Sequence, residues 1–143
     1  MPQRHTKITL KKYLSYAIVL IFITVFQLID RIFLNYFQYQ INDQFVFGLV
    51  DLPNFLLIFL CLALLTAFIT LKKYQFGIGL ILSGSISNLI DRISTGGVID
   101  YIKIPFFAPM LNLSDIFISF GALLIILAII FKTNFQTKQK PAL

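Results

Sequence analysis

The last long apolar run of the chain decides its fold. Residues 113–131 read LSDIFISFGALLIILAIIF, and an aspartate near the start is the only ionisable side chain in this stretch. Its length is close to the ~20 apolar residues that cross the hydrocarbon core of a bilayer as a helix. Backbone polar groups find no water inside lipid, so we expect the run to be helical. The sequence thus predicts a membrane-spanning segment in this part of the chain.

Three further apolar runs precede it, at residues 13–29, 52–71 and 76–90. The 143-residue chain is 58% hydrophobic and 13% charged, with a mean hydropathy of +0.87, which lies outside the usual range of a soluble globule. None of the runs alternates polar and apolar positions as the strands of a membrane barrel do. We therefore predict an all-α membrane protein, one domain over residues 1–143 with four transmembrane helices.

The lysines and arginines predict how these helices are oriented. Nine of the 12 lie in three segments, before the first run, between the second and third, and after the fourth: Arg4, Lys7, Lys11, Lys12, Lys72, Lys73, Lys132, Lys138 and Lys140. With four spans these segments share one side of the membrane, which the positive-inside rule assigns to the cytoplasm. Both termini are therefore predicted to be cytoplasmic. The six acidic residues, all aspartates, lie at or between the run ends that face the other side.

Charge and composition argue against several other classes of protein. The net charge of +6 follows the predicted topology, whereas a nucleic-acid surface would need basic residues interleaved with stacking aromatics. One histidine (His5), one cysteine (Cys61) and no glutamate leave no material for the usual zinc sites or histidine-dependent triads. We expect no cofactor, no metal and no nucleic-acid partner. The first run lacks a small-x-small cleavage site, so we also expect it to be retained.

The segment between the third and fourth runs carries the candidate chemistry. A turn cluster at residues 94–97 leads into a stretch rich in β-branched residues at 98–104, which is typical of a short strand and predicts a small extracytoplasmic β-rich cap. Alternation would put Asp100 on one face of that strand, alone among aliphatic side chains. An ionised acid on an apolar face is costly, so Asp100 is expected to find partners or to hold a proton.

Asp115 lies at the start of the fourth run. Asn112 and Asp115 resemble a capping box, and a carboxylate there favours the positive end of the helix dipole by ~0.3–1 kcal/mol. Asp115 also lies about one turn inside the membrane boundary, where ionisable residues are functional candidates. The topology returns Asp100 and Asp115 to one membrane surface. Two close carboxylates share a proton, so one can act as general base for a water and the other as general acid for a leaving amine, as in aspartic peptide hydrolysis.

Other polar residues of the third run have structural explanations. Gly79, Ser83 and Ser87 form a stripe of small residues, the usual means of close helix packing in membranes. Asp91 is expected to pair with the neighbouring Arg92 and is left out of the site.

The residues at 84–92, 97–100 and 112–115 resemble the signature region of the lipoprotein signal peptidase family, also called signal peptidase II. The resemblance implies a four-helix aspartic peptidase in the bacterial cytoplasmic (inner) membrane, with its active site at the extracytoplasmic face. It implies a substrate too, a prolipoprotein whose lipobox cysteine carries diacylglycerol and which is cleaved N-terminal to that cysteine. By their positions in the family motif, Asp100 and Asp115 would be the catalytic pair. The same resemblance implies that Asn88, Arg92 and Asn112 line the site.

The N-terminal half matches the family less closely. Asp30 corresponds to an aspartate near the end of the first helix, but Leu34 stands where the family usually has a lysine. A second family element is kept in part at residues 42–48, where Asn42 remains and the usual glycine and alanine are replaced. Asn42 and Asp30 complete the predicted substrate-binding set. We expect a divergent active member whose partners are prolipoproteins and membrane lipids, with a monomer as the simpler state.

Two other functions stay open. Small four-span proteins with intramembrane acids can be proton-coupled transporters or channel subunits, although such sites usually lie near the bilayer midplane, often between internal repeats. Here the acids cluster at one edge, and the two halves of the chain show no repeat. An inactive relative that binds lipoproteins without cleaving them is the third possibility.

Overall fold

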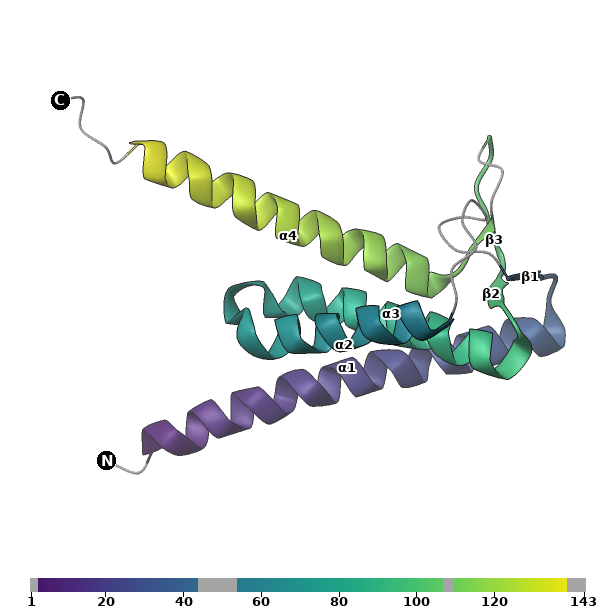
Figure 1. Cartoon of the computed structure of the whole chain (residues 1–143), viewed down its shortest axis with the longest axis horizontal. Coiled ribbons are helices and arrows are strands. Elements are labelled where there is room, and N and C mark those ends of the chain that lie inside the picture. Colours follow the sequence, from purple (N-terminus) through teal and green to yellow (C-terminus); the bar gives the residue numbers. More distant parts are fainter. Residues whose placement is uncertain (1–2, 44–53, 107–109, 139–143) are drawn as a thin grey trace.

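The computed structural model describes residues 3–43, 54–106 and 110–138. Four helices run roughly along its long axis (Figure 1): α1 (Gln3–Tyr36), α2 (Asn54–Thr70), α3 (Gln75–Thr95) and α4 (Leu113–Lys138). A short 3-10 helix, η1 (Lys72–Tyr74), joins α2 to α3. Short strands gather at one end of the helices, and the start of α1 and the end of α4 lie at the opposite end (Figure 1).

The predicted apolar helices are confirmed. Three helical segments are long and apolar enough to cross a membrane, Tyr13–Tyr36, Lys72–Thr95 and Leu113–Phe131, and a shorter apolar helix covers Phe55–Thr70. The first and third helices continue beyond the predicted ends at residues 29 and 90. They continue because the acids there do not face solvent: Asp30 and Asp91 are both 0% exposed.

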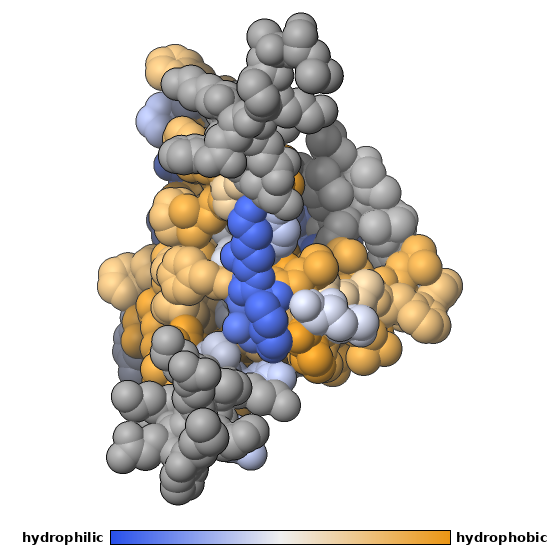
Figure 2. Space-filling view, turned by 90° about the vertical axis from the view of Figure 1, so that its left-hand side faces the viewer, coloured by the Kyte–Doolittle hydropathy of each residue, from blue (hydrophilic) through white to orange (hydrophobic). Residues whose placement is uncertain are grey.

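Large apolar side chains cover the outside of the helices. Leu20, Phe59 and Phe131 are each more than half exposed. Seen from the end that holds η1, hydrophilic side chains form a narrow central patch bordered by apolar ones (Figure 2), and Lys72 and Lys73 of η1 are exposed. An apolar exterior of this extent matches lipid as the surrounding solvent.

Helix α3 is the central helix and packs against the other three. A small core forms where Ile78 and Leu82 of α3 meet Val19 of α1 and Phe68 of α2. The predicted small-residue stripe packs against α1 and α2: Gly79 lies against Phe68 and Val19, and the Ser83 hydroxyl is within 3.5 Å of the Val19 carbonyl oxygen. The packing role of this stripe is confirmed.

A second glycine seam, which the sequence analysis missed, joins α3 to α4. A Cβ added at Gly84 would lie 2.6 Å from the Ser114 carbonyl oxygen, and one added at Gly121 would lie 2.5 Å from the Gly77 carbonyl oxygen. Glycine at these positions lets the two backbones touch. The first turn of α4 is therefore held directly on α3.

The strands form two small antiparallel pairs at the end of the helices. Strand β1 (Gln40–Asn42) pairs with β2 (Val98–Asp100), and β3 (Ile102–Lys103) pairs with β4 (Met110–Leu111). The prediction of one continuous strand over 98–104 is wrong, because the chain changes partners at Tyr101. The expected alternation is also wrong, since all three residues of β2 are buried.

Candidate functional site

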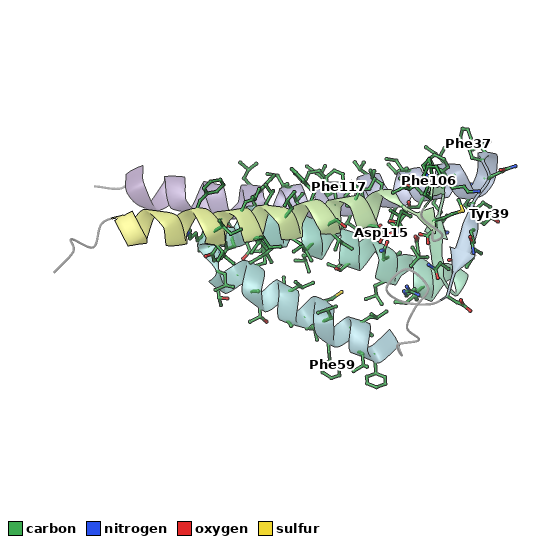
Figure 3. The ribbon with its side chains drawn as sticks, turned by 90° about the horizontal axis from the view of Figure 1, so that it is seen from above. Phe37, Tyr39, Phe59, Phe106, Asp115 and Phe117 are labelled. Atoms are coloured by element: carbon green, nitrogen blue, oxygen red, sulfur yellow. The ribbon has the colours of Figure 1, made fainter. Side chains whose placement is uncertain are left out.

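Asp100 and Asp115 come together where β2 meets the start of α4, and one asparagine connects them. The side-chain amide of Asn112 donates from Nδ2 to Asp100 Oδ1 at 3.1 Å. The backbone N–H of Asn112 donates to Asp115 Oδ2 at 3.2 Å, and the backbone N–H of Asp115 donates back to Asn112 Oδ1 at 2.9 Å. This reciprocal pair is the predicted capping box, so the acid is held by the helix start itself. Figure 3 shows Asp115 toward the end of the helices that also holds Tyr39 and Phe106.

Asn88 of α3 holds the second acid from the other side. Its Nδ2 donates to Asp115 Oδ1 at 2.9 Å, and its Oδ1 accepts from Asn112 Nδ2 at 3.1 Å. Both oxygens of Asp115 therefore accept hydrogen bonds from neutral donors. The glycine seam beneath Asn88 brings α3 close enough for this contact.

Asn42 reaches Asp100 across the β1–β2 pair. The register sets Asn42 opposite Val98, and the diagonal position two residues on is Asp100. The Nδ2 of Asn42 donates to Asp100 Oδ2 at 3.1 Å. The expectation of an acid alone among aliphatic side chains is therefore wrong, because amides on both sides satisfy it.

The environment of Asp100 changes its acidity. Asp100 is 3% exposed, and this burial raises the pKa of its carboxyl to about 7. The hydrogen bond from Asn42 opposes that rise in pKa, while the nearby charge of Asp115 adds to it. A carboxyl with a pKa near neutrality can both hold and release a proton under physiological conditions. This property is what one member of an acid–base pair needs.

Arg92 holds the end of β1 through backbone carbonyl oxygens. Its guanidinium donates from Nη1 to the carbonyl oxygens of Asn42 and Asp43, at 3.5 and 3.1 Å. Arg92 thereby keeps Asn42 beside Asp100. Residues 44–48, which carry the remainder of the second family element, lie outside the described ranges.

Asp30 lies behind the two acids and is fully buried. Its Oδ2 is 3.5 Å from the Ser87 hydroxyl, and its carboxyl faces the ring of Tyr101 at the hydroxyl end. A side chain with 0% exposure has no surface for a substrate in this conformation, so the arrangement favours a supporting role for Asp30.

Asp91, which the sequence pairs with Arg92, has a different neighbour in the structure. Its Oδ1 accepts a hydrogen bond from Gln27 Nε2 at 3.0 Å, on the α1 side of α3. Gln27 also donates to the Ser87 hydroxyl oxygen at 3.1 Å. The spacing could have predicted this side of the helix, since Asp91 follows Ser83 and Ser87 at four-residue intervals on the same helix face.

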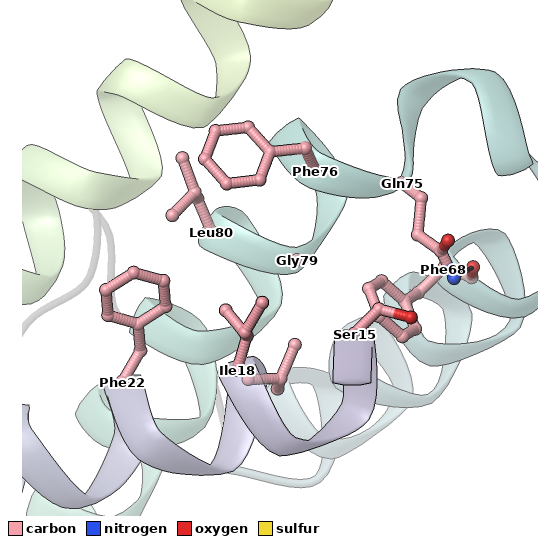
Figure 4. A pocket seen from close by; sticks show the side chains of 9 residues that line it. Ser15, Ile18, Phe22, Phe68, Gln75, Phe76, Gly79 and Leu80 are labelled. Atoms are coloured by element: carbon pink, nitrogen blue, oxygen red, sulfur yellow. Dashed lines mark hydrogen bonds between the residues drawn. The ribbon is translucent and has the colours of Figure 1, made fainter. Parts of the chain in front are cut away.

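Several pockets lie among the helices. A pocket of about 50 Å³ adjoins the site and is lined by Asn88 and Arg92 together with Cys61 of α2 and Ile118 of α4. A larger apolar cavity of about 140 Å³ lies between α1, α2 and α3, with Phe22, Phe68 and Phe76 around it (Figure 4). The larger cavity shares no lining residue with the site. In the described ranges no three histidine, cysteine or acidic side chains cluster as a metal site would require.

Comparisons with known proteins agree with these features. The family model described as signal peptidase (SPase) II matches residues 4–131. A lipoprotein signal peptidase of Chlamydia abortus is 34% identical over 111 residues, covering 69% of this chain and 65% of the relative. One from Caldanaerobacter subterraneus subsp. tengcongensis is 42% identical over 59 residues, covering 41% of each protein. The chain's matches span about half the length of these curated relatives.

Solved structures share the fold. A bacterial membrane enzyme determined by the in meso method at 2.3 Å resolution has a TM-score of 0.74 at 21% identity, covering 90% of this chain and 94% of that one. A second, at 1.9 Å resolution, has a TM-score of 0.68 at 23% identity, covering 80% and 91%. Since the family model covers nearly all of the helical part of the chain, this protein belongs to the signal peptidase II family.

Proposed function

We propose that this chain is a membrane aspartic endopeptidase. It removes the signal peptide from diacylglyceryl-modified prolipoproteins by cutting N-terminal to the lipidated cysteine. The observation that supports this most directly is that Asn112 bonds both acids, Asp100 through its side-chain amide and Asp115 through its backbone N–H. The names of the curated relatives agree with the substrate class.

The two carboxyls take different roles in this proposal. In this proposal Asp115, whose two oxygens both accept hydrogen bonds at the positive end of α4, is the general base that takes a proton from water. Asp100, with its pKa raised to about 7 by burial, holds the proton and donates it to the leaving amine. The water adds to the scissile carbonyl, and the peptide C–N bond breaks when the amine is protonated.

The small pocket beside the site suggests how a lipid-bearing peptide approaches. Its apolar lining includes Leu57 of α2 and Ile118 of α4, and its polar lining includes Asn88 and Arg92 of α3. In this proposal the diacylglyceryl chains stay in the bilayer while the peptide reaches the polar side. Asn42 and Arg92 then hold β1 over the substrate.

The proposed orientation puts the strands on the extracytoplasmic face of the bacterial inner membrane, with both termini in the cytoplasm. The exposed Lys72 and Lys73 lie at the end opposite the strands, where the positive-inside rule favours cytoplasm. The two acids lie at one end of the helices rather than mid-span, which does not favour a coupled transporter.

The proposed function predicts that Asp100→Asn and Asp115→Asn each abolish cleavage. Each variant removes a proton acceptor or donor, so the rate should fall by about 10²- to 10⁴-fold, the usual contribution of a general acid or base. The measurement is a gel-shift assay with the purified chain and a diacylglyceryl-modified prolipoprotein.

Lys103→Gln is the control, because it also replaces a charged group by an amide, on an exposed side chain of β3. It should cleave at the rate of the unaltered protein. Full cleavage by either dyad variant, or no cleavage of the lipidated precursor by the unaltered chain, would contradict the proposal. An unlipidated precursor should not be cut.

A further inference from the structure

Tyr101 occupies the point where the chain passes from β2 to β3, directly after Asp100. Its ring stacks on Phe33 of α1, with 3.8 Å between ring centroids and 8° between their planes. Its backbone N–H donates to the Leu111 carbonyl oxygen at 2.9 Å. These contacts fix the direction in which the phenol points.

The Tyr101 hydroxyl oxygen accepts a hydrogen bond from the backbone N–H of Leu113 at 3.3 Å. Leu113 is the first residue of α4, so its N–H has no partner within the helix. A side chain beside Asp100 therefore binds the backbone two residues before Asp115. This hydrogen bond therefore joins the segment that carries Asp100 to the segment that carries Asp115, as Asn112 also does.

The buried Asp30 carboxyl lies near the Tyr101 hydroxyl, close enough to affect its acidity, and Oδ1 of Asp30 has no hydrogen bond among the described residues. Burial, together with the charge of Asp30, raises the pKa of Tyr101, so the phenol stays protonated and can act as a donor. Asp30 in turn contacts Ser87 of α3.

We propose that the Tyr101 hydroxyl is a positioning group for the peptidase reaction. It binds the first N–H of α4 and lies beside the buried carboxyl of Asp30, and so sets the distance between Asp100 and Asp115. The inference rests on the proposed function. It gives Asp30 a role in orienting Tyr101 without any contact with substrate.

Tyr101→Phe tests the role directly, since it keeps the ring that stacks on Phe33 and removes only the hydroxyl. The expected result is a fall in kcat of about tenfold or more with KM changed by less than about twofold, because substrate contacts remain while the acids lose their alignment. The matched control is Tyr16→Phe, a hydroxyl deletion on a ring packed edge-on against Phe68. It should leave kcat unchanged.

A double-mutant cycle with Asp30→Asn separates positioning from general stability. If Asp30 acts through the Tyr101 hydroxyl, Asp30→Asn lowers kcat in the unaltered protein and lowers it much less in the Tyr101→Phe background. Equal effects in both backgrounds would overturn the proposed connection.

Hydrogen exchange gives a readout that does not depend on cleavage. The Leu113 amide should exchange faster in Tyr101→Phe than in the unaltered protein, because it loses its only described acceptor. Unchanged exchange at Leu113 would overturn the inference. So would a Tyr101→Phe variant as active as an active unaltered enzyme. An unaltered chain that fails to cleave contradicts the proposed function instead, while the exchange measurement still tests the hydrogen bond.

Discussion

Asn112 contributes to the site through a neutral amide. It donates to Asp100, bonds Asn88 and caps α4 beside Asp115. A lysine or arginine in direct contact would hold a carboxyl in its ionised form, whereas amides allow it to keep a proton. This choice of partners explains how a buried acid pair can contain one protonated and one ionised member.

The raised pKa of Asp100 predicts how stability depends on pH. Its folded pKa of about 7 exceeds the ordinary value of 3.8, so the folded protein binds more protons than the unfolded chain between these values. The contribution of Asp100 to the free energy of unfolding is therefore full below pH ~4 and is lost as pH rises through ~7. Asp100→Asn removes this dependence. Thermal unfolding in detergent should show the variant gaining stability relative to the unaltered protein between pH ~4 and ~8.

The opposite trend in that comparison, with the variant losing relative stability as pH rises, would mean that Asp100 is ionised at neutral pH in the folded protein. Ser119→Ala, an exposed substitution that removes no titratable group, serves as the control and should show no such trend.

At the scale of elements, the helices could be predicted, and so could extended structure within residues 98–104, but not the break in it or the partners of each strand. An apolar run must become a helix in lipid whatever surrounds it, so the sequence alone identifies it. The break at Tyr101 depends on Phe33 and Leu113, which are distant in the chain, and no local pattern encodes those contacts. Strand β1 likewise forms only because β2 lies beside it.

The residues of the candidate site also form two groups, those that local spacing predicts and those that depend on contacts distant in the chain. Asp115 and Asn112 form a local capping box, so their spacing predicts the geometry. The partnership of Asn42 with Asp100 depends on strand register, and that of Asp91 with Gln27 on which face of α1 meets α3. The sequence could therefore indicate the residues of the pair more readily than the residues that hold them.

The contact between α3 and α4 makes a prediction about Gly84. In Gly84→Ala the new methyl group would meet the Ser114 carbonyl oxygen at 2.6 Å and Ile118 Cγ1 at 2.7 Å, so the first turn of α4 must move away from α3. Overpacking of this kind costs about 1–3 kcal/mol. The movement should also lengthen the 2.9 Å contact of Asn88 with Asp115. We expect a lower Tm and a lower kcat.

Ser119→Ala, on an exposed position of α4, is the control for that substitution and should change neither quantity. A Gly84→Ala variant with unaltered Tm and kcat would show that the two helices can separate there without cost.

At the scale of the whole molecule, the basic residues of η1 and the candidate catalytic acids lie at opposite ends of the helices. The carboxylates and the strands share one end, and the basic η1 turn lies at the other, with apolar helix surface between them (Figures 1 and 2). The proposed function requires lipid around the middle, with the two ends in different aqueous compartments. A protein that cuts exported precursors needs its acids in the outer compartment, so orientation is a requirement of the proposed function.

Cysteine accessibility tests that orientation. In a Cys61→Ser background, Lys73→Cys should react with a membrane-impermeant maleimide only after the cytoplasmic side is opened, while Lys103→Cys, on the exposed β3, should react in intact cells stripped of outer barriers. The two sites lie at opposite ends of the helices, so they must label from opposite sides if the helices span the bilayer. Labelling of both from one side would mean that the strand end and the η1 end face the same compartment, and the carboxylates could not then be assigned to the outer surface.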